Sequence, residues 1–388
     1  MSDSETREVA LKWVLNLRSG TSCDERVDNG RFPVMGASGS IGRTNRANTK
    51  AGSAIIGRVG TVGAVNRTTT DCWASDNAIV ATPGPSLTSP YMFYLLLGAR
   101  LPELASKTAQ PLLTATSIGD QRFVIPGLAE QRRISDFLDT ETARIDQLIQ
   151  LYGKLATLTN ERSQRVVDEA VDRGEKSVPL RYVIRFREGP GIMATDFHTS
   201  GVPLIRIAGL KQGKVSLNGC NFLDPEKVAH QWPHFRLRIG DRLISGSATM
   251  GGVSVVNDPT VVGAIPYTGL IILRPAHANV CMEYIEAFLQ SSLFSRQINL
   301  LKTGATMQHF GPTHLSQVRV PMPPLNRQQS AAAIAREALS HAFHCKELTK
   351  RQIALLKERR QALITAAVTG QLDVSTASGR NVTEGVFA

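Results

Sequence analysis

The chain is an imperfect duplication, and this internal repeat limits what it can fold into. Residues 9–20 (VALKWVLNLRSG) return as 178–189 (VPLRYVIRFREG) at an offset of 169, from 178 − 9. Residues 118–131 match 315–328 at an offset of 197, from 315 − 118, and this match continues without a gap far into the segments that follow. The repeat therefore predicts two similar domains, each followed by a rigid element of constant length.

The variable part of each copy precedes this constant element. Residues 52–60 (GSAIIGRVG) return as 240–248 (GDRLISGSA) at an offset of 188, from 240 − 52, so the second copy contains insertions. Short apolar runs punctuated by glycine and proline predict strands and turns, with helices near 91–97 and 283–288. At 388 residues the chain is also too long for one ordinary domain. The expected α+β domains are 1–127 and 175–324.

The two constant elements predict long helices. The first, 128–174, is entered through Pro126 and closed by Gly174, and the second, 325–371, is closed by Gly370. At 1.5 Å per residue, about 45 residues make a rod of roughly 65 Å. We expect residues 372–388 to form a flexible tail.

Apolar residues recur along both helices at heptad spacing, so one stripe of each faces a partner. A helix of this length cannot bury its stripe alone. The simplest solution is an α+β fold in which two pseudo-repeated α/β domains are joined by two long antiparallel helices that form a coiled-coil spacer. The alternative is that each helix folds onto the core of its own domain. The expected packing residues are Leu138, Ile145, Leu148, Tyr152, Leu155, Val166, Ile334, Leu348, Leu355, Leu356 and Leu363.

The charge of the chain indicates a polyanionic partner. It carries 44 Lys and Arg against 33 Asp and Glu, a formal net charge of +11, and its isoelectric point is near 9.7. Nucleic acid is the default partner for such a composition, and the alternative is a protein that is simply basic.

The order domain, helix, domain, helix, with the junctions VIPGLAEQ at 124–131 and VPMPPLNRQ at 320–328, resembles the specificity subunit of type I restriction-modification systems. The strings IIGRVG at 55–60, KTGATMQ at 302–308 and ALITAAVTG at 362–370 add to the resemblance, which covers nearly the whole chain. Each motif is common, but their order, duplication and spacing together are specific.

The resemblance implies a chain with two target-recognition domains, each of which reads one half of a split sequence in double-stranded DNA. The helical spacer then sets the gap between the half-sites. It also implies docking of methyltransferase subunits, two of them, and of restriction or translocase subunits. The cofactor S-adenosylmethionine is expected in the methyltransferase and no cofactor in this chain.

Sequence-specific DNA binding needs cations on phosphates and hydrogen-bonding side chains at base edges. The first domain offers such residues among glycines, and the second offers them in three separate segments, of which 303–308 is the best single loop. The alternative for each residue is a solvated loop or a structural ion pair. The candidate DNA-binding residues are Arg43, Asn45, Arg46, Lys50, Arg58, Thr61, Asn66, Arg67, Arg206, Lys211, Lys214, Ser247, Thr249, Lys302, Thr303, Thr306 and Gln308. The aromatic residues at the matched positions Trp13 and Tyr182 are expected to be core anchors.

No catalytic signature stands out in the sequence. There is no GxxxxGK[ST], HExxH or GxSxG string, and the five cysteines form no CxxC pair. His309 and His314 lack a third convergent ligand for a metal. With no secretory signal and no long apolar segment, we expect a cytoplasmic, non-catalytic subunit. The other classes left open are an unrecognised DNA-modifying enzyme and a scaffold that binds RNA or protein through its basic domains.

We predict that binding of this chain to DNA falls steeply as salt rises, because each phosphate contact releases counterions. Binding should also depend on a target split into two parts. Titration of duplexes at several salt concentrations checks both expectations, and binding indifferent to sequence and to half-site spacing would contradict them.

Overall fold

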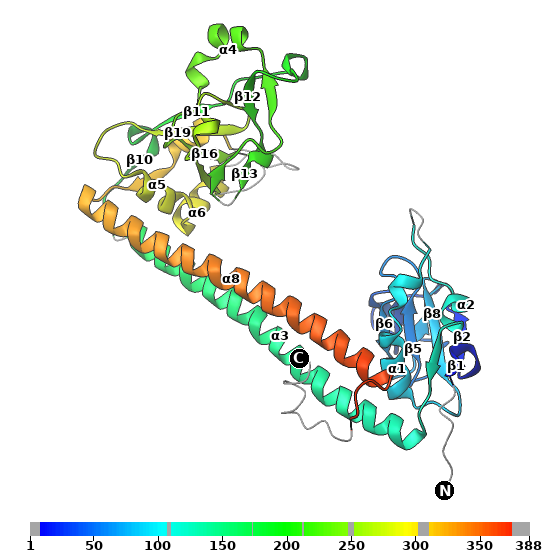
Figure 1. Ribbon diagram of the computed structural model, residues 1–388. Coiled ribbons are helices and arrows are strands. Elements are labelled where there is room, and N and C mark those ends of the chain that lie inside the picture. Colours follow the sequence, from blue (N-terminus) through cyan, green and yellow to red (C-terminus); the bar gives the residue numbers. More distant parts are fainter. Residues whose placement is uncertain are drawn as a thin grey trace. The chain divides into compact units, whose positions relative to one another are not determined.

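The computed structural model describes residues 8–106, 110–172, 174–211, 213–246, 252–301 and 310–374. They divide into two compact units, shown in Figure 1, which are treated separately. The first unit is Met1–Gly153 with Lys350–Ala388, and the second is Lys154–Thr349. The long helices α3 (Leu128–Val171) and α8 (Leu325–Val368) each contribute to both units. They begin where the sequence predicted and end three residues earlier.

The domain of the first unit is built on a four-stranded antiparallel sheet of order β2-β8-β5-β6 and a three-stranded sheet of order β4-β3-β7, in which β3 and β7 are parallel. A β1-β9 pair leads into α3. The elements are β1 (Glu8–Ala10), β2 (Leu15–Ser19), β3 (Phe32–Gly36), β4 (Gly39–Thr44), β5 (Ala54–Gly57), β6 (Val65–Arg67), β7 (Trp73–Ala74), β8 (Ala78–Pro83), β9 (Arg122–Val124), α1 (Ser89–Gly98) and α2 (Ala115–Gly119), with 3₁₀ turns at Leu11–Trp13 and Leu101–Leu104.

The domain of the second unit contains a six-stranded sheet of order β11-β19-β16-β17-β14-β13 and a three-stranded sheet of order β15-β12-β18. A β10-β20 pair leads into α8. The elements are β10 (Ser177–Pro179), β11 (Ile184–Glu188), β12 (Val202–Ile205), β13 (Leu210–Lys211), β14 (Lys214–Val215), β15 (Asn221–Leu223), β16 (Arg242–Ser245), β17 (Val253–Val255), β18 (Ile265–Pro266), β19 (Leu270–Pro275), β20 (Arg319–Pro321), α4 (Pro225–Gln231), α5 (Met282–Leu289), α6 (Ser292–Leu301) and α7 (Pro312–Gln317). Five 3₁₀ turns are Leu180–Tyr182, Ala194–Asp196, Ile207–Gly209, Pro233–Phe235 and Pro259–Val261.

The duplication predicted from the sequence is present in the folds of the two domains. The order and directions of β2-β8-β5-β6 recur in β11-β19-β16-β17. Gly52 and Gly240, at the offset of 188, both have φ of 83°, a left-handed conformation that glycine adopts without strain, and each precedes the equivalent strand. The insertion in the second copy is the β13-β14 hairpin, which lies between β12 and β15, whereas β3 and β4 are joined directly. The predicted helices at 91–97 and 283–288 lie within α1 and α5.

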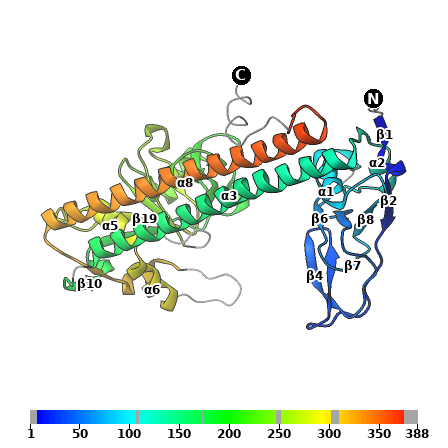
Figure 2. The same cartoon turned by 90° about the horizontal axis from the view of Figure 1, so that it is seen from below.

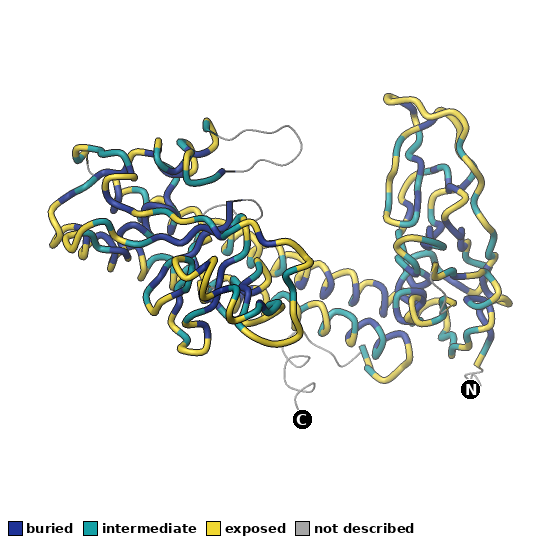
Figure 3. Tube along the Cα trace, turned by 90° about the horizontal axis from the view of Figure 1, so that it is seen from above, coloured by how far each residue is buried: buried dark blue, intermediate teal, exposed yellow. Residues whose placement is uncertain are grey.

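Each domain core is continuous with the ends of the long helices. In the first unit, Tyr91 and Leu95 of α1 share a cluster with Leu138 of α3 and Ile364 of α8. In the second unit, Tyr284 and Phe288 of α5 share a cluster with Val171 of α3, Ala331 and Ala335 of α8, and the buried interiors are marked in Figure 3. The two arrangements weighed from the sequence, a helix pair and helices packed on domains, therefore occur together.

A buried glutamine joins the first domain to the start of α3. Gln131 has no exposed surface, and its Oε1 accepts the N–H of Thr88 at 2.8 Å. Its Nε2 donates to the carbonyls of Ser86 at 2.7 Å and Pro126 at 2.8 Å. Because Thr88 is the N-cap of α1 and its side chain makes no capping bond, this amide holds the entry of that helix.

An equivalent buried glutamine joins the second domain to the start of α8. Gln328, 2% exposed, accepts the N–H of Cys281 at 2.9 Å and donates to the carbonyls of Pro323 at 2.9 Å and Asn279 at 3.4 Å. Cys281 is the N-cap of α5, as Thr88 is of α1. The gapless match of the sequence therefore includes a repeated hydrogen-bonding group.

A buried tyrosine makes the second attachment in each unit. The hydroxyl of Tyr91 donates to the carbonyl of Val368 at 3.4 Å, and that of Tyr284 to the carbonyl of Val171 at 3.3 Å. Burial raises the pKa of both phenols, so they remain donors over the ordinary pH range. Each domain is thus bonded to the start of one long helix and to the end of the other.

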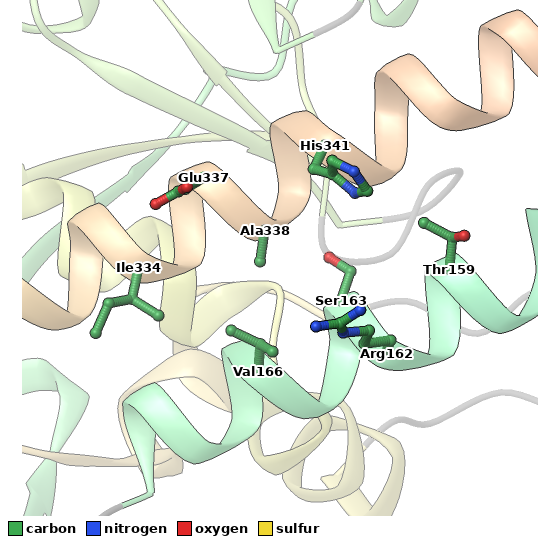
Figure 4. A pocket seen from close by; sticks show the side chains of 8 residues that line it. All are labelled: Thr159, Arg162, Ser163, Val166, Ile334, Glu337, Ala338 and His341. Carbon is green, nitrogen blue, oxygen red and sulfur yellow. The ribbon is translucent and has the colours of Figure 1, made fainter.

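The helix halves within each unit pair in antiparallel fashion. In the first unit, Arg360 Nε lies 3.2 Å from Asp146 Oδ1, and Leu363 packs in the cluster of Leu138. In the second unit, Cys345 Sγ lies 3.6 Å from Thr159 Oγ1. A gap of about 390 Å³ lies in this second pairing, and Figure 4 shows the side chains that line it. It is lined by Thr159, Arg162, Ser163, Val166, Ile334, Glu337, Ala338 and His341.

The seam of the helices differs from the predicted one at five positions. Leu138, Ile145 and Leu363 are buried, and Tyr152, Val166 and Leu356 are half-buried. The five exposed residues lie one position before the seam residues Ile149, Ala156, Ala335, Thr349 and Leu356, and a shift of one residue turns a side chain by about 100°. The seam of α8 consists largely of small residues, so the size of the leucines beside it misled the prediction. The exposed residues are Leu148, Leu155, Ile334, Leu348 and Leu355.

We predict that Gln131→Ala lowers the free energy of unfolding of the first unit by about 1–3 kcal/mol, because it leaves buried backbone groups without partners. Thermal unfolding and hydrogen exchange of the α1 amides measure the effect. The control is Gln147→Ala at an exposed position of α3, where about 0.5 kcal/mol or less is expected. Equal stability of the two variants would show that the amide does not hold this junction.

Candidate nucleic-acid interface

Several candidate cations of the first domain are engaged within the domain itself. Arg43 Nε donates to the carbonyl of Gly30 at 2.6 Å, and its Nη2 to that of Arg31 at 3.1 Å. Asn45 Oδ1 accepts the N–H of Arg31 at 3.2 Å. Arg43 and Asn45 therefore brace the segment ahead of β3.

Two further candidates form ion pairs. Lys50 Nζ lies 3.0 Å from Asp71 Oδ2, and Arg67 Nη1 lies 3.6 Å from Asp139 Oδ1 of α3. The N–H of Ala51 and then the ammonium of Lys50 hold the pKa of Asp71 below its usual value. Lys50 and Arg67 thus have acidic partners that the sequence did not indicate.

Four candidates remain available at the surface of the first domain. Arg46 is exposed just after β4, and Arg58 is half-buried at the end of β5, where its backbone bonds Asn77 and Leu113. Neither guanidinium has a partner among the residues that the structure describes. Thr61 is exposed, and Asn66 keeps a buried Nδ2 with no hydrogen-bond partner in the described part of the chain. Figure 2 shows β4 at the end of this domain away from α1.

In the second domain the candidates divide in the same way. Arg206 Nη1 donates to Asn221 Oδ1 at 2.9 Å, and its guanidinium lies 4.6 Å from the ring centroid of Tyr267 and 5.9 Å from that of Phe197. This arginine packs between elements of the domain.

Lys211 and Lys214 are exposed on the β13-β14 hairpin, opposite each other in register, with no side-chain partner among the described residues. The hairpin is the outer edge of the six-stranded sheet and has no counterpart in the first copy. The remaining candidates lie outside the described residues: Ser247, Thr249, Lys302, Thr303, Thr306 and Gln308.

The matched aromatic residues Trp13 and Tyr182 are not core anchors. Trp13 is 77% exposed and Tyr182 is 59% exposed. Each ends a 3₁₀ turn in which the preceding Leu11 or Leu180 is the buried member, so the apolar neighbours occupy the core and the ring points outward. Both copies therefore present an aromatic ring, preceded by a cation, at the same place of the fold.

Metal-binding clusters and membrane-spanning helices are not seen among the described residues. They contain no group of three or more His, Cys, Asp and Glu side chains placed to hold a metal. His314 Nδ1 accepts the N–H of Gly311 at 3.1 Å and so caps α7, while His309 lies outside the described residues. No helix in the described ranges is both long and apolar enough to cross a bilayer.

Comparison with known proteins finds similarity to the specificity subunits of type I restriction enzymes. Residues 3–159 match the model of the type I restriction modification DNA specificity domain. The type I restriction enzyme MjaVIII specificity subunit of Methanocaldococcus jannaschii is 20% identical over 311 residues, which are 73% of this chain and 70% of that one. The EcoKI specificity subunit of Escherichia coli K12 is 23% identical over 266 residues, which are 64% of this chain but only 57% of that protein.

Solved structures agree at the level of the fold. A chain from a study of complex assembly and conformational transition of the type I R-M system has a TM-score of 0.72 at 18% identity, covering 94% of this chain and 98% of that one. The HsdS subunit of Thermoanaerobacter tengcongensis has a TM-score of 0.53 at 20% identity, with coverage of 94% and 97%. The resemblance seen in the sequence is thus confirmed: this chain is similar to the specificity subunits of type I restriction-modification systems, and its residues 3–159 match the model of their DNA specificity domain.

Proposed function

We propose that this chain recognises a bipartite sequence in double-stranded DNA, one part through each domain, and directs methyltransferase subunits to it in the cytoplasm. The observation that carries the proposal is the duplicated sheet, built twice on one chain with the same strand order. Two similar readers in one molecule suit a target in two parts, because two modest affinities combine into one joint affinity that also depends on spacing.

The exposed, unpaired side chains are the proposed contacts with DNA. Arg46 and Arg58 in the first domain and Lys211 and Lys214 in the second have no competing acidic partner among the described residues. Such cations contact phosphates, and an arginine also reads guanine through two hydrogen bonds. The candidates within 302–308 belong to the same proposal.

Chemistry on the DNA is assigned to the partner. A methyltransferase subunit would supply the active site and S-adenosylmethionine. This chain would determine the DNA sequence at which that subunit acts. Restriction or translocase subunits would join the same complex.

The matched aromatics support two docking sites for one kind of partner. Lys12-Trp13 and Arg181-Tyr182 are repeated cation and aromatic pairs on otherwise different domains. Exposed tryptophan and tyrosine commonly dominate protein interfaces. One methyltransferase on each copy would account for the recurrence of this surface.

We predict that, when this chain is co-expressed with its methyltransferase subunit, one bipartite DNA motif with a fixed gap becomes methylated. Insertion of seven residues into both α3 and α8 keeps the seam in phase and lengthens each helix by about 10.5 Å. At 3.4 Å per base pair, the tolerated gap should grow by about three. Mapping methylated bases across a genome checks both outcomes. A single undivided motif, or no motif, would contradict recognition of a bipartite target and would favour a scaffold role.

We predict that Trp13→Ala and Tyr182→Ala each remove one methyltransferase from the complex and that the double variant removes both. Native mass spectrometry of the co-expressed complex measures the stoichiometry. Leu300→Ala, at a position 87% exposed on α6, is the control and should leave it unchanged. DNA binding by the chain alone should persist in all variants. Full stoichiometry in the double variant would place the docking surface elsewhere.

A further inference from the structure

Five arginines surround a cleft of about 620 Å³ at one edge of the six-stranded sheet in the second domain. The cleft lies over β11, β19 and the start of β16. Arg185 pairs in register with Arg274, and paired residues of antiparallel strands point to the same face. The five are Arg185, Arg187, Arg238, Arg242 and Arg274.

A buried carboxylate organises this cleft. Asp241 is 5% exposed, and its two oxygens accept Nε and Nη2 of Arg274, each at 2.7 Å. The same carboxylate accepts the N–H of Arg238 at 2.8 Å. Asp241 therefore fixes both the Arg274 guanidinium and the turn that carries Arg238. The fold therefore fixes the positions of these groups without a bound ligand.

Three of the guanidinium groups have no carboxylate partner. Arg242 is neutralised by Glu283 at 2.8 Å and Glu286 at 2.6 Å. By contrast, Arg185 and Arg238 are exposed and have no side-chain partner among the described residues.

Arg187 has only neutral partners in the described part of the chain. It donates to the carbonyl of His234 at 3.2 Å and lies 5.5 Å from the ring centroid of Phe235. The contact with the ring orients the group without removing its charge. The cleft thus presents unpaired positive charge beyond what the fold itself uses.

The first domain keeps two of these cations but uses them internally: Arg18, at the position of Arg187, donates to Asn48 and Thr49, and Lys50, at that of Arg238, pairs with Asp71. Ser53 stands where the second copy has Asp241, at the offset of 188, and the strand register places Thr82 of β8 where β19 has Arg274. Their hydroxyls lie 3.4 Å apart in place of the ion pair. Asn16 stands at the position of Arg185. Because the same sheet forms in the first copy without counterparts of Asp241, Arg274 and Arg185, folding of the sheet does not require these three residues.

We propose that the arginine cleft binds phosphates of the DNA backbone, so that the second domain contacts the duplex at a site distinct from Lys211 and Lys214. This inference rests on the proposed function. The guanidinium fork matches a phosphate through two hydrogen bonds, and a duplex offers such groups at every 3.4 Å along each strand. Several arginines are then satisfied at once, whereas a protein partner would need a matching cluster of carboxylates.

The two cationic places are well separated on one sheet. The cleft begins at the β11 edge, and Lys211 on β13 and Lys214 on β14 are five and four strand spacings away from β11 in the order of the sheet. At about 4.8 Å per spacing, five spacings are roughly 24 Å. Phosphate contacts at the cleft would add affinity without base discrimination, and they would do so in the second domain only.

The test measures binding of the full chain to a duplex of random sequence at several salt concentrations. Each phosphate contact contributes about 0.9 to the slope of log K against log salt, so Arg185→Gln/Arg238→Gln should reduce the slope by about 1.8. The control is Arg165→Gln/Arg296→Gln, which removes the same charge from exposed arginines of α3 and α6. The control should leave the slope unchanged.

The outcomes separate this inference from the proposed function. A wild-type chain whose binding to DNA ignores salt contradicts the proposed function itself. Salt-dependent binding with an equal slope in the cleft variant, or an equal loss in the control, overturns the cleft alone. Loss of the methyltransferase with an unchanged slope would identify a protein partner instead. Independently of any substitution, the duplex should protect Arg185 and Arg238 of the wild-type chain from an arginine-selective reagent, as read by mass spectrometry.

Discussion

The rest of the structure depends on how each domain is attached to the long helices. A buried amide is costly unless its hydrogen bonds are made, and Gln131 and Gln328 each make three. The hydroxyls of Tyr91 and Tyr284 add a bond to the end of the opposite helix. Because all these partners are backbone groups, the attachment restricts geometry while leaving the outer surface of each domain unconstrained. The same set of hydrogen bonds can therefore attach two domains whose outer surfaces differ.

The two copies use that freedom differently. Their inner strands keep the same order, but the pair Ser53 and Thr82 is replaced by Asp241 and Arg274, and the β13-β14 hairpin is added in the second copy. Divergence at the sheet edges with constancy at the helix junctions is consistent with the proposed recognition of two unlike half-sites. The exposed aromatics near the junctions are retained in both, which agrees with one kind of partner bound twice.

The candidate site shows where reasoning from residue types reaches its limit. The glycine-rich, cationic segment of the first domain lies largely on β4 and β6, Lys50 meets an aspartate 21 positions away, and Arg206 lies against Tyr267. A charge that the fold uses internally looks the same in a sequence as one that faces solvent. The alternating arginines at 185 and 187 were the available signal for the cleft, and only the register of β11 with β19 brings them to Arg274.

The sequence by itself determined the duplication, the two long helices to within three residues of their ends, the α+β class and the preference for a polyanion. These properties follow from periodicity, offsets and composition, which are local or additive along the chain. Only the tertiary structure decided which helical positions face the seam, because Ile334 and Leu348, one residue before Ala335 and Thr349, give nearly the same periodicity. It also decided which candidate cations remain unpaired, since the ion pairs of Lys50, Arg67 and Arg274 join residues that lie far apart in the chain.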